Sequence, residues 1–282
     1  MKNIDFIVNY YWRPNYPETI RLSAWLAIQS LKIVDIVGDI LLVDGSLEGD
    51  NEIRLICEKE KIMYVHKGKE LRFAEGYNCW KMLSSQYIGL MASDIIVNPI
   101  AIQKLYKVIT VERVGCVFPY LDRCDYQGQI YSYVRKAKTC EPTFMTLNLN
   151  IFKREVLEKI NGIDENFSGG YNDILTLLQI RRSGYKALLV GATQVTHLGK
   201  MTVSNGTNYD WEKDSIKFKT SYPEYWDKIS RWNIKRWLPP FAVNKRVSFL
   251  AWLVHKFPSK YGELDRLFMR IEPDLTFFRL KY

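Results

Sequence analysis

The sequence has few of the residues that would form a disulfide framework or a structural metal site. Among its 282 residues are five cysteines, which are dispersed along the chain and include no C-x-x-C pair. An odd and scattered set of cysteines argues against disulfides and against a zinc site, and it suits a reducing cytosol. The three histidines are too far apart in the sequence to propose a histidine cluster. We therefore expect a cytoplasmic protein.

Long hydrophobic runs are also lacking. The longest, ILLV, ALLV and FLAWLV, are far too short to span a bilayer. The opening residues, MKNIDFIVNYY, place an acid inside the apolar run and offer no small-residue cleavage site, so no signal peptide is expected. With 47% hydrophobic and 25% charged residues, the composition is typical of a globular protein with a sizeable core.

Several motifs of common enzyme classes are absent. No G-x-G-x-x-G follows the first apolar run, which disfavours a dinucleotide-binding Rossmann domain. The sequence has no G-x-x-x-x-G-K-[ST], no G-x-S-x-G and no H-E-x-x-H. A phosphate-binding P-loop, a hydrolase nucleophile elbow and a zinc protease helix are thereby excluded.

The net charge of +9 is unevenly placed. Most of the surplus of basic residues falls from Lys200 onward, and this part also holds five of the eight tryptophans. A basic, aromatic segment favours contact with an anionic membrane surface or a phosphorylated acceptor. A solvated basic face above a small aromatic core is the alternative, and an oligomer contact is a further one. No nucleic-acid partner is expected.

Short apolar runs alternate with helical patterns through the first part of the chain. This alternation predicts an α/β protein with a mostly parallel central sheet and helices on both faces. The expected strands are 3–11, 38–46, 62–68, 87–95, 114–121 and 185–190, and the expected helices are 17–31, 50–61, 74–86, 99–112 and 172–184. A strand and a short helix are expected within 143–162, closed by Gly162.

Polar residues stand at the carboxyl ends of three expected strands. Tyr10, Asp44 and Asp94 each follow an apolar run. In open parallel sheets, ligands bind outside the carboxyl ends of the strands. An acid such as Asp94 at the end of a buried strand is thus expected to point into a binding cleft, because a buried unpaired acid would be costly.

Four stretches, in this order, give the chain its resemblance to a known family. They are FIVNYY, ILLVDGS, LRFAEGYNCWKMLSSQYIGLMASDIIVNP and the segment from IFKREVLEKING to GATQVTHLG. Together they resemble the family 2 glycosyltransferases, which have the GT-A fold and include bacterial polysaccharide and rhamnosyl transferases. The resemblance implies a GT-A domain over 1–204, with a nucleotide-sugar half about 1–100 and an acceptor half about 101–204. A helical extension would occupy 205–282.

The resemblance implies a donor site in the first half. It assigns contacts with a nucleotide-diphosphate sugar to Tyr10, Asp44, Arg72, Ser93 and Asp94. Asp94 and His197 would hold a divalent cation, Mn²⁺ or Mg²⁺, against the diphosphate. Hard cations prefer oxygen ligands, and an imidazole ligand favours Mn²⁺.

Ala92 departs from the family pattern, which often has an acid two residues before the metal-binding Asp. The departure leaves one protein carboxylate where two are common. The metal dependence expected from the resemblance is therefore least secure at this position.

On the acceptor side, the resemblance makes Asp173 the general base of an inverting transfer to a glycan or lipid-linked acceptor, as in cell-surface polysaccharide synthesis. Asn172 stands at the first position of the family's ED pair, and Gly169 and Gly170 would let the backbone pass close to the acceptor. Because Asp173 begins an expected helix, we expect it to be ionised at neutral pH.

Each of these residues also has a structural interpretation. Asp44, Asp94 and Asp173 could be turn or helix caps, Tyr10 a buried aromatic, Arg72 a surface arginine, His197 a loop histidine and the glycines a plain turn. Two other functions remain open. The chain could be a degenerate GT-A domain that binds nucleotide or glycan without turnover. It could also be a sugar-phosphate nucleotidylyltransferase, although its first strand is followed by no glycine-rich loop.

Overall fold

The computed structural model describes residues 3–121, 139, 141, 145–199 and 210–223. The predicted extension 205–282 is therefore described only over 210–223. Four of its tryptophans, Trp226, Trp232, Trp237 and Trp252, lie outside the described residues. Within the described part, no helix has the length and apolar character needed to cross a membrane.

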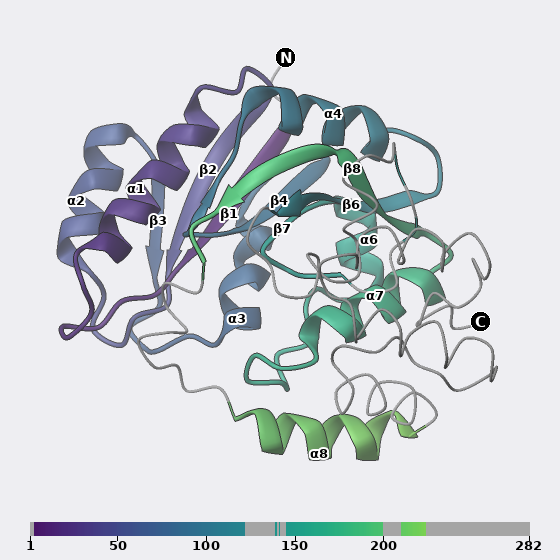
Figure 1. Cartoon of the computed structure of the whole chain (residues 1–282). Helices are drawn as coiled ribbons and strands as arrows, with labels where there is room; N and C mark the ends of the chain where they lie inside the picture. Colours follow the sequence, from purple (N-terminus) through teal and green to yellow (C-terminus); the bar gives the residue numbers. More distant parts are fainter. Residues whose placement is uncertain (1–2, 122–138, 140, 142–144, 200–209, 224–282) are drawn as a thin grey trace, which may run out of the picture.

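One eight-stranded sheet forms the centre of the molecule, with strand order β3-β2-β1-β4-β7-β6-β8-β5 (Figure 1). Its strands are β1 (Ile4–Tyr10), β2 (Val37–Asp44), β3 (Met63–His66), β4 (Tyr87–Ala92), β5 (Ile95–Ile96), β6 (Val114–Leu121), β7 (Leu149–Lys153) and β8 (Lys186–His197). The β3-β2-β1-β4 part and the β6–β8 pair are parallel, whereas β7 runs antiparallel to both of its neighbours. The predicted mostly parallel α/β architecture is confirmed.

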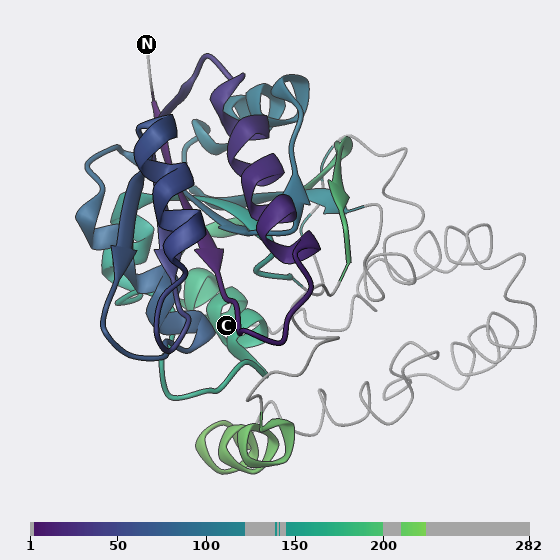
Figure 2. The ribbon, with the colours of Figure 1, turned by 90° about the vertical axis from the view of Figure 1, so that its left-hand side faces the viewer.

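Helices cover both faces of the sheet (Figures 1 and 2). On one face, α1 (Thr19–Lys32) and α4 (Pro99–Ile109) pack on the sheet, and α2 (Asn51–Glu60) packs beside α1. The other face carries α3 (Phe73–Tyr77), η1 (Asn78–Met82), α6 (Arg154–Lys159) and α7 (Asn172–Arg182), with Phe218 of α8 (Trp211–Ser221) joining their core. The two layers of apolar side chains are the expected result of strands buried on both faces.

Local sequence signals set several element ends. Asp50 accepts hydrogen bonds from the backbone N–H groups of Glu52 and Ile53 and begins α2. Asn98 caps α4 in the same manner, and Pro99 occupies its first turn, where no N–H donor is needed. These residues recur at helix starts because the first N–H groups of a helix lack partners within it.

Three predicted elements differ in the structure. The helix expected over 74–86 is instead a short α-helix followed by the 3-10 turn η1, and the chain leaves it at Leu83 in an extended conformation. The strand expected over 87–95 ends at Ala92 and is followed by the separate strand β5. The strand expected over 185–190 continues to His197, because its second part pairs with β5 and β6.

Candidate functional site

Asp94 and His197 are brought together by the pairing of two strands. Asp94 lies in the turn between β4 and β5, and β5 pairs antiparallel with the end of β8, so that Ile95 faces His197. The Leu198 N–H group donates to the Asp94 carbonyl at 2.9 Å. As a result, Nε2 of His197 lies 3.3 Å from Oδ2 of Asp94, with about a tenth of each side chain exposed (10% and 11%).

This pair fits the first ligands of a divalent cation. Neighbouring ligands of an octahedral ion with bonds of about 2.1 Å lie about 3 Å apart, close to the separation of these two atoms. One carboxylate and one imidazole also suit Mn²⁺ or Mg²⁺ when oxygen atoms of a ligand complete the shell. Among the described residues, no group of three or more histidine, cysteine or acidic side chains could hold a metal ion.

Ala92 and Ser93 lie in line with the end of β1. Ala92 is the register partner of Asn9, and the Ser93 N–H group donates to the Asn9 carbonyl at 3.3 Å. Ser93 is buried. Residues 92–93, which lead to Asp94, are thus fixed to the carboxyl end of β1. Ligands are expected to bind at this side of the sheet.

Tyr10 and Asp44 are the last residues of β1 and β2 and are register partners, but both are buried. Asp44 accepts hydrogen bonds from the Ser46 N–H group at 2.9 Å, the Asp50 N–H group at 2.6 Å and the Tyr64 hydroxyl at 2.7 Å. The Tyr10 hydroxyl donates to Asp50 at 2.6 Å. Burial, together with that hydrogen bond, raises the pKa of Tyr10 far above its ordinary value. These contacts match the alternative interpretations of the two residues, a buried aromatic and a turn cap.

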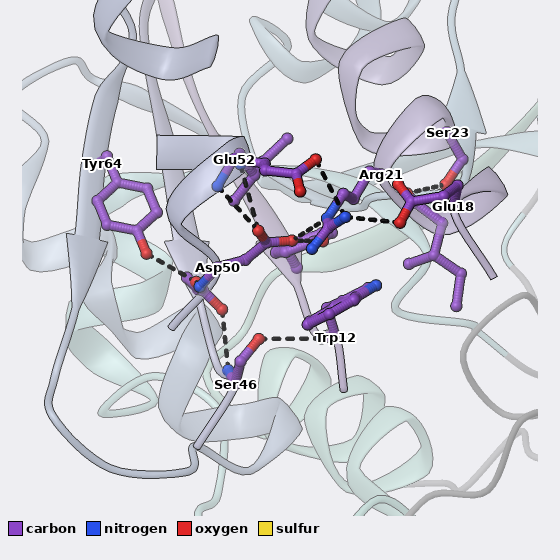
Figure 3. A network of polar contacts seen from close by, with 12 residues as sticks. Trp12, Glu18, Arg21, Ser23, Ser46, Asp50, Glu52 and Tyr64 are labelled. Atoms are coloured by element: carbon purple, nitrogen blue, oxygen red, sulfur yellow. Dashed lines mark hydrogen bonds and ion pairs between the residues drawn. The ribbon is translucent and has the colours of Figure 1, made fainter. Parts of the chain in front are cut away.

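The sequence interpretation missed the residues around which this edge is organised. Arg21 of α1 forms ion pairs with the buried Asp50 at 2.7 Å and with Glu18 and Glu52, and its guanidinium lies 4.0 Å from the centre of the Trp12 ring (Figure 3). The expected helix 50–61 begins at this acid, but the pairing of Asp50 with Arg21, distant in sequence, carries no local signal.

Arg72 lies at the start of α3, where its N–H group donates to Glu75 at 2.8 Å. Its guanidinium donates to the Glu165 carbonyl at 3.4 Å. Arg72 is thus at the boundary between α3 and the loop that leads to α7. Asn78 reinforces this boundary, because its side chain bonds both Ile163 and Glu165.

Asp173 lies in the first turn of α7, where Oδ1 accepts from the Ile174 N–H group at 2.8 Å. The Asp173 side chain is partly buried, and this burial raises the pKa of its carboxyl to about 7, against the opposing effect of the Ile174 and Asp173 N–H groups. The loss of solvent thus opposes the ionisation that the helix start favours. A carboxyl group with a pKa near 7 can accept and release a proton at physiological pH.

The other predicted acceptor-side residues already have partners within the chain. Asn172 is buried and donates to the Asp164 carbonyl at 3.0 Å. The N–H groups of Gly169 and Gly170 donate to Asp214 of α8, at 3.1 and 2.8 Å. The sequence interpretation also missed Asp214. The sequence around an acid within a helix does not show which distant N–H groups bond to it.

No family model matches this chain, and no curated protein matches it by sequence. Among solved structures, it is similar to a mannosyltransferase of Pyrobaculum calidifontis determined with GDP-Man and Mn²⁺. The TM-score is 0.57 and the identity 13%, over 96% of this chain and 86% of that one.

Two further structures show the same likeness. GalNAc-T7, determined with UDP, GalNAc and Mn²⁺, has a TM-score of 0.60 and 13% identity over 92% of this chain, which spans only 55% of that protein. Residues 1–349 of TarS from S. aureus have a TM-score of 0.57 and 11% identity, over 98% of this chain and 89% of that one. The expected GT-A-like fold is thereby confirmed.

Proposed function

We propose that this chain is an inverting glycosyltransferase of the family 2 type. It would move a sugar from a nucleotide-diphosphate sugar to a glycan or lipid-linked acceptor during synthesis of a cell-surface polysaccharide. The observation that carries the proposal is the Asp94–His197 pair, 3.3 Å apart at the end of β8. The similar structures bound to GDP-Man and Mn²⁺, and to UDP and Mn²⁺, support a donor and a cation of this kind.

Asp94 and His197 would hold the cation. Once bound, Mn²⁺ or Mg²⁺ lowers the energy of the negative charge that develops on the departing diphosphate. The described part of the chain would supply two ligands to the cation, one carboxylate oxygen and one imidazole nitrogen. Arg72, which donates a hydrogen bond to the loop before α7, would offer a further positive charge to the diphosphate.

Asp173 would act on the acceptor. Its carboxylate takes the proton of the attacking hydroxyl as the oxygen bonds to the anomeric carbon. The bond from that carbon to the diphosphate breaks, and its electron pair leaves with the nucleoside diphosphate. A single displacement of this kind inverts the configuration at the anomeric carbon, and the pKa of about 7 suits Asp173 to the proton transfer.

Base recognition belongs to a different set of residues from the one first expected. Tyr10 and Asp44 are buried and form hydrogen bonds within the chain. We therefore assign them a structural role at the carboxyl ends of β1 and β2. Tyr11, Trp12 and Arg13 follow β1 directly and are each only partly buried. We assign stacking of the base to this segment, because it follows β1 and carries two partly exposed aromatic rings.

A screen of UDP-, GDP- and dTDP-linked sugars by thermal shift, with and without Mn²⁺, tests donor binding. Release of the nucleoside diphosphate from the stabilising donor then tests turnover, and NMR of the product tests inversion. We expect Asp173→Asn to abolish transfer and to retain donor binding. Full turnover by Asp173→Asn would exclude it as the base.

A degenerate domain that binds nucleotide or glycan without turnover is the second candidate. Its support is Ala92, together with the absence of a third protein ligand for a cation among the described residues. Nucleotide binding that is independent of metal, with no turnover of any donor in the screen, would favour it.

A further inference from the structure

The loop before α7 surrounds a carboxylate from another helix. The Ser168 N–H group donates to both oxygens of Asp214, at 2.9 and 3.0 Å, and the Ser168 hydroxyl donates at 2.8 Å. The Gly169 and Gly170 N–H groups donate to Oδ2 at 3.1 and 2.8 Å. Consecutive N–H groups that converge in this way form an anion-binding concavity.

Asp214 is nearly inaccessible to solvent, with 2% of its surface exposed. A buried carboxylate is costly unless hydrogen bonds compensate its charge. Here the compensating donors belong to one three-residue segment of the loop. The conformation of residues 168–170 and the burial of Asp214 therefore depend on each other.

A second contact from the same helix holds the ends of this segment. Phe218 lies one turn after Asp214 and is completely buried. Its ring is stacked on that of Tyr171 at a centroid distance of 5.0 Å and lies 6.2 Å from that of Phe167. Helix α8 thus contacts the loop at both ends through Phe218 and in the middle through Asp214, as its position beside the loop in Figure 1 suggests.

The loop needs this support because it contains strained backbone. Tyr171, the residue before α7, has φ = 65°, a value that costs energy for any residue except glycine. Such a conformation persists only when surrounding contacts impose it. The orientation of the first turn of α7, which carries Asp173, follows from the conformation of Tyr171.

We propose that Asp214 is a positioning residue that holds Asp173 in place for transfer, a role that rests on the function proposed above. The carboxylate fixes residues 168–170, the loop fixes Tyr171, and Tyr171 sets the start of α7. Asp214 would thus affect the rate of transfer through the position of Asp173, without contacting the substrate.

Asp214→Asn tests this role, because it keeps the shape of the side chain and removes the charge that attracts the N–H groups. Glu212→Gln, at an exposed acid of the same helix, is the matched control. For Asp214→Asn we expect amide hydrogen exchange over 168–173 to accelerate by at least about tenfold. We expect kcat to fall about 10- to 100-fold with an unchanged KM for the donor, because a small misplacement of a reacting group is sufficient.

The pH–rate midpoint separates positioning from general destabilisation. Asp173 is partly buried, so opening of the loop would expose it further to water and move the midpoint from about 7 towards the ordinary value of an aspartate. A purely structural defect would leave the midpoint of the folded enzyme unchanged. If Asp214→Asn fails to fold, Phe218→Leu offers a second test, because it weakens the contacts of α8 with Phe167 and Tyr171. We expect smaller changes in exchange rate, kcat and pH midpoint, in the same direction.

Wild-type exchange rates, kcat and pH midpoint in Asp214→Asn would overturn the proposal. If the wild-type chain itself shows no transfer, the proposed function fails. In that case, exchange over 168–173 and the pKa of Asp173, measured by NMR of the carboxyl carbon, decide the role of Asp214. A shift in both quantities supports positioning, and no shift overturns it.

Discussion

The carboxylate of Asp94 and the imidazole of His197 lie 3.3 Å apart, although Asp94 lies in the turn between β4 and β5 and His197 is the last residue of β8. The short strand β5 pairs with the end of β8 and brings the two residues together. The site therefore depends on two residues of backbone pairing, Ile95 and Ile96. Cation binding at this pair can therefore be tested by substitutions that leave the rest of the fold unchanged.

Loss of either member of the pair should weaken cation binding. For Asp94→Asn and for His197→Gln we expect the affinity for Mn²⁺ to fall by at least about tenfold, because even the loss of an outer-shell partner has effects of that size. Electron paramagnetic resonance of free Mn²⁺ during titration measures the change. Asp35→Asn, at an exposed acid, serves as the control. Unchanged affinity in both site variants would exclude the pair as ligands.

The rate of transfer should rise with pH through the titration of Asp173. A general base acts only when deprotonated, and burial raises the pKa of this group to about 7. We expect kcat to increase about tenfold per pH unit below the midpoint and to reach a plateau above about pH 8. Steady-state rates between pH 5 and 9 measure the profile, and a rate independent of pH across this range would contradict the assignment.

Asp173 should also lower the stability of the fold as the pH rises. Its pKa is about 7 in the folded chain, above its ordinary value of 3.8, so the folded state binds more protons between these values. Stability is therefore lost progressively from about pH 4 to about pH 7. We expect Asp173→Asn to raise the melting temperature relative to wild type more at pH 8 than at pH 4. Equal differences at the two pH values would contradict the raised pKa.

Arg21→Met should destabilise the protein strongly, because Asp50 would keep a buried charge without its ion-pair partner. We expect the free energy of unfolding to fall by about 3 kcal/mol. Arg54→Met provides the comparison, since Arg54 pairs with Glu58 on the exposed face of α2 and should cost less than about 1 kcal/mol. Urea denaturation measures the free energy of unfolding of both variants. Similar decreases in the two would show that the buried ion pair contributes no more than the exposed one.

The contact between Gly89 and Phe6 leaves no room for a side chain. A Cβ atom at Gly89 would lie 2.2 Å from the Phe6 ring, in the middle of the sheet. We expect Gly89→Ala to lower the free energy of unfolding by about 1–3 kcal/mol through overpacking. Because the clash involves one ring, Phe6→Leu in the same chain should recover part of the loss. Additive effects of the two substitutions would exclude this explanation.

The order and type of most elements could be predicted because they depend on local patterns. The alternation of apolar runs and helical periodicity located β1, β2, β3, β6 and α7 closely. The direction of β7 and the extension of β8 to His197 depend on partners that are distant in sequence, so they carry no local signal.

The site was partly predictable for the same reason. Resemblance located Asp94 and His197, and the structure brings them together. It could not show that Tyr10 and Asp44 are turned into a buried network, because Asp50, Tyr64 and Arg21 complete that network from other elements. Nor could it show that burial, rather than the helix start, dominates the proton affinity of Asp173.

The pairing of β5 with β8 determines when the two candidate metal ligands can meet during synthesis of the chain. The sheet edge formed by β1, β2 and β4 lies within the first hundred or so residues, and parallel pairing of these strands needs only the intervening helices. The candidate metal ligands meet only after β8 has emerged from the ribosome and closed a long loop onto β5. A nascent chain that stops before His197 would retain the β1-β2-β4 edge but lack one of the two candidate ligands.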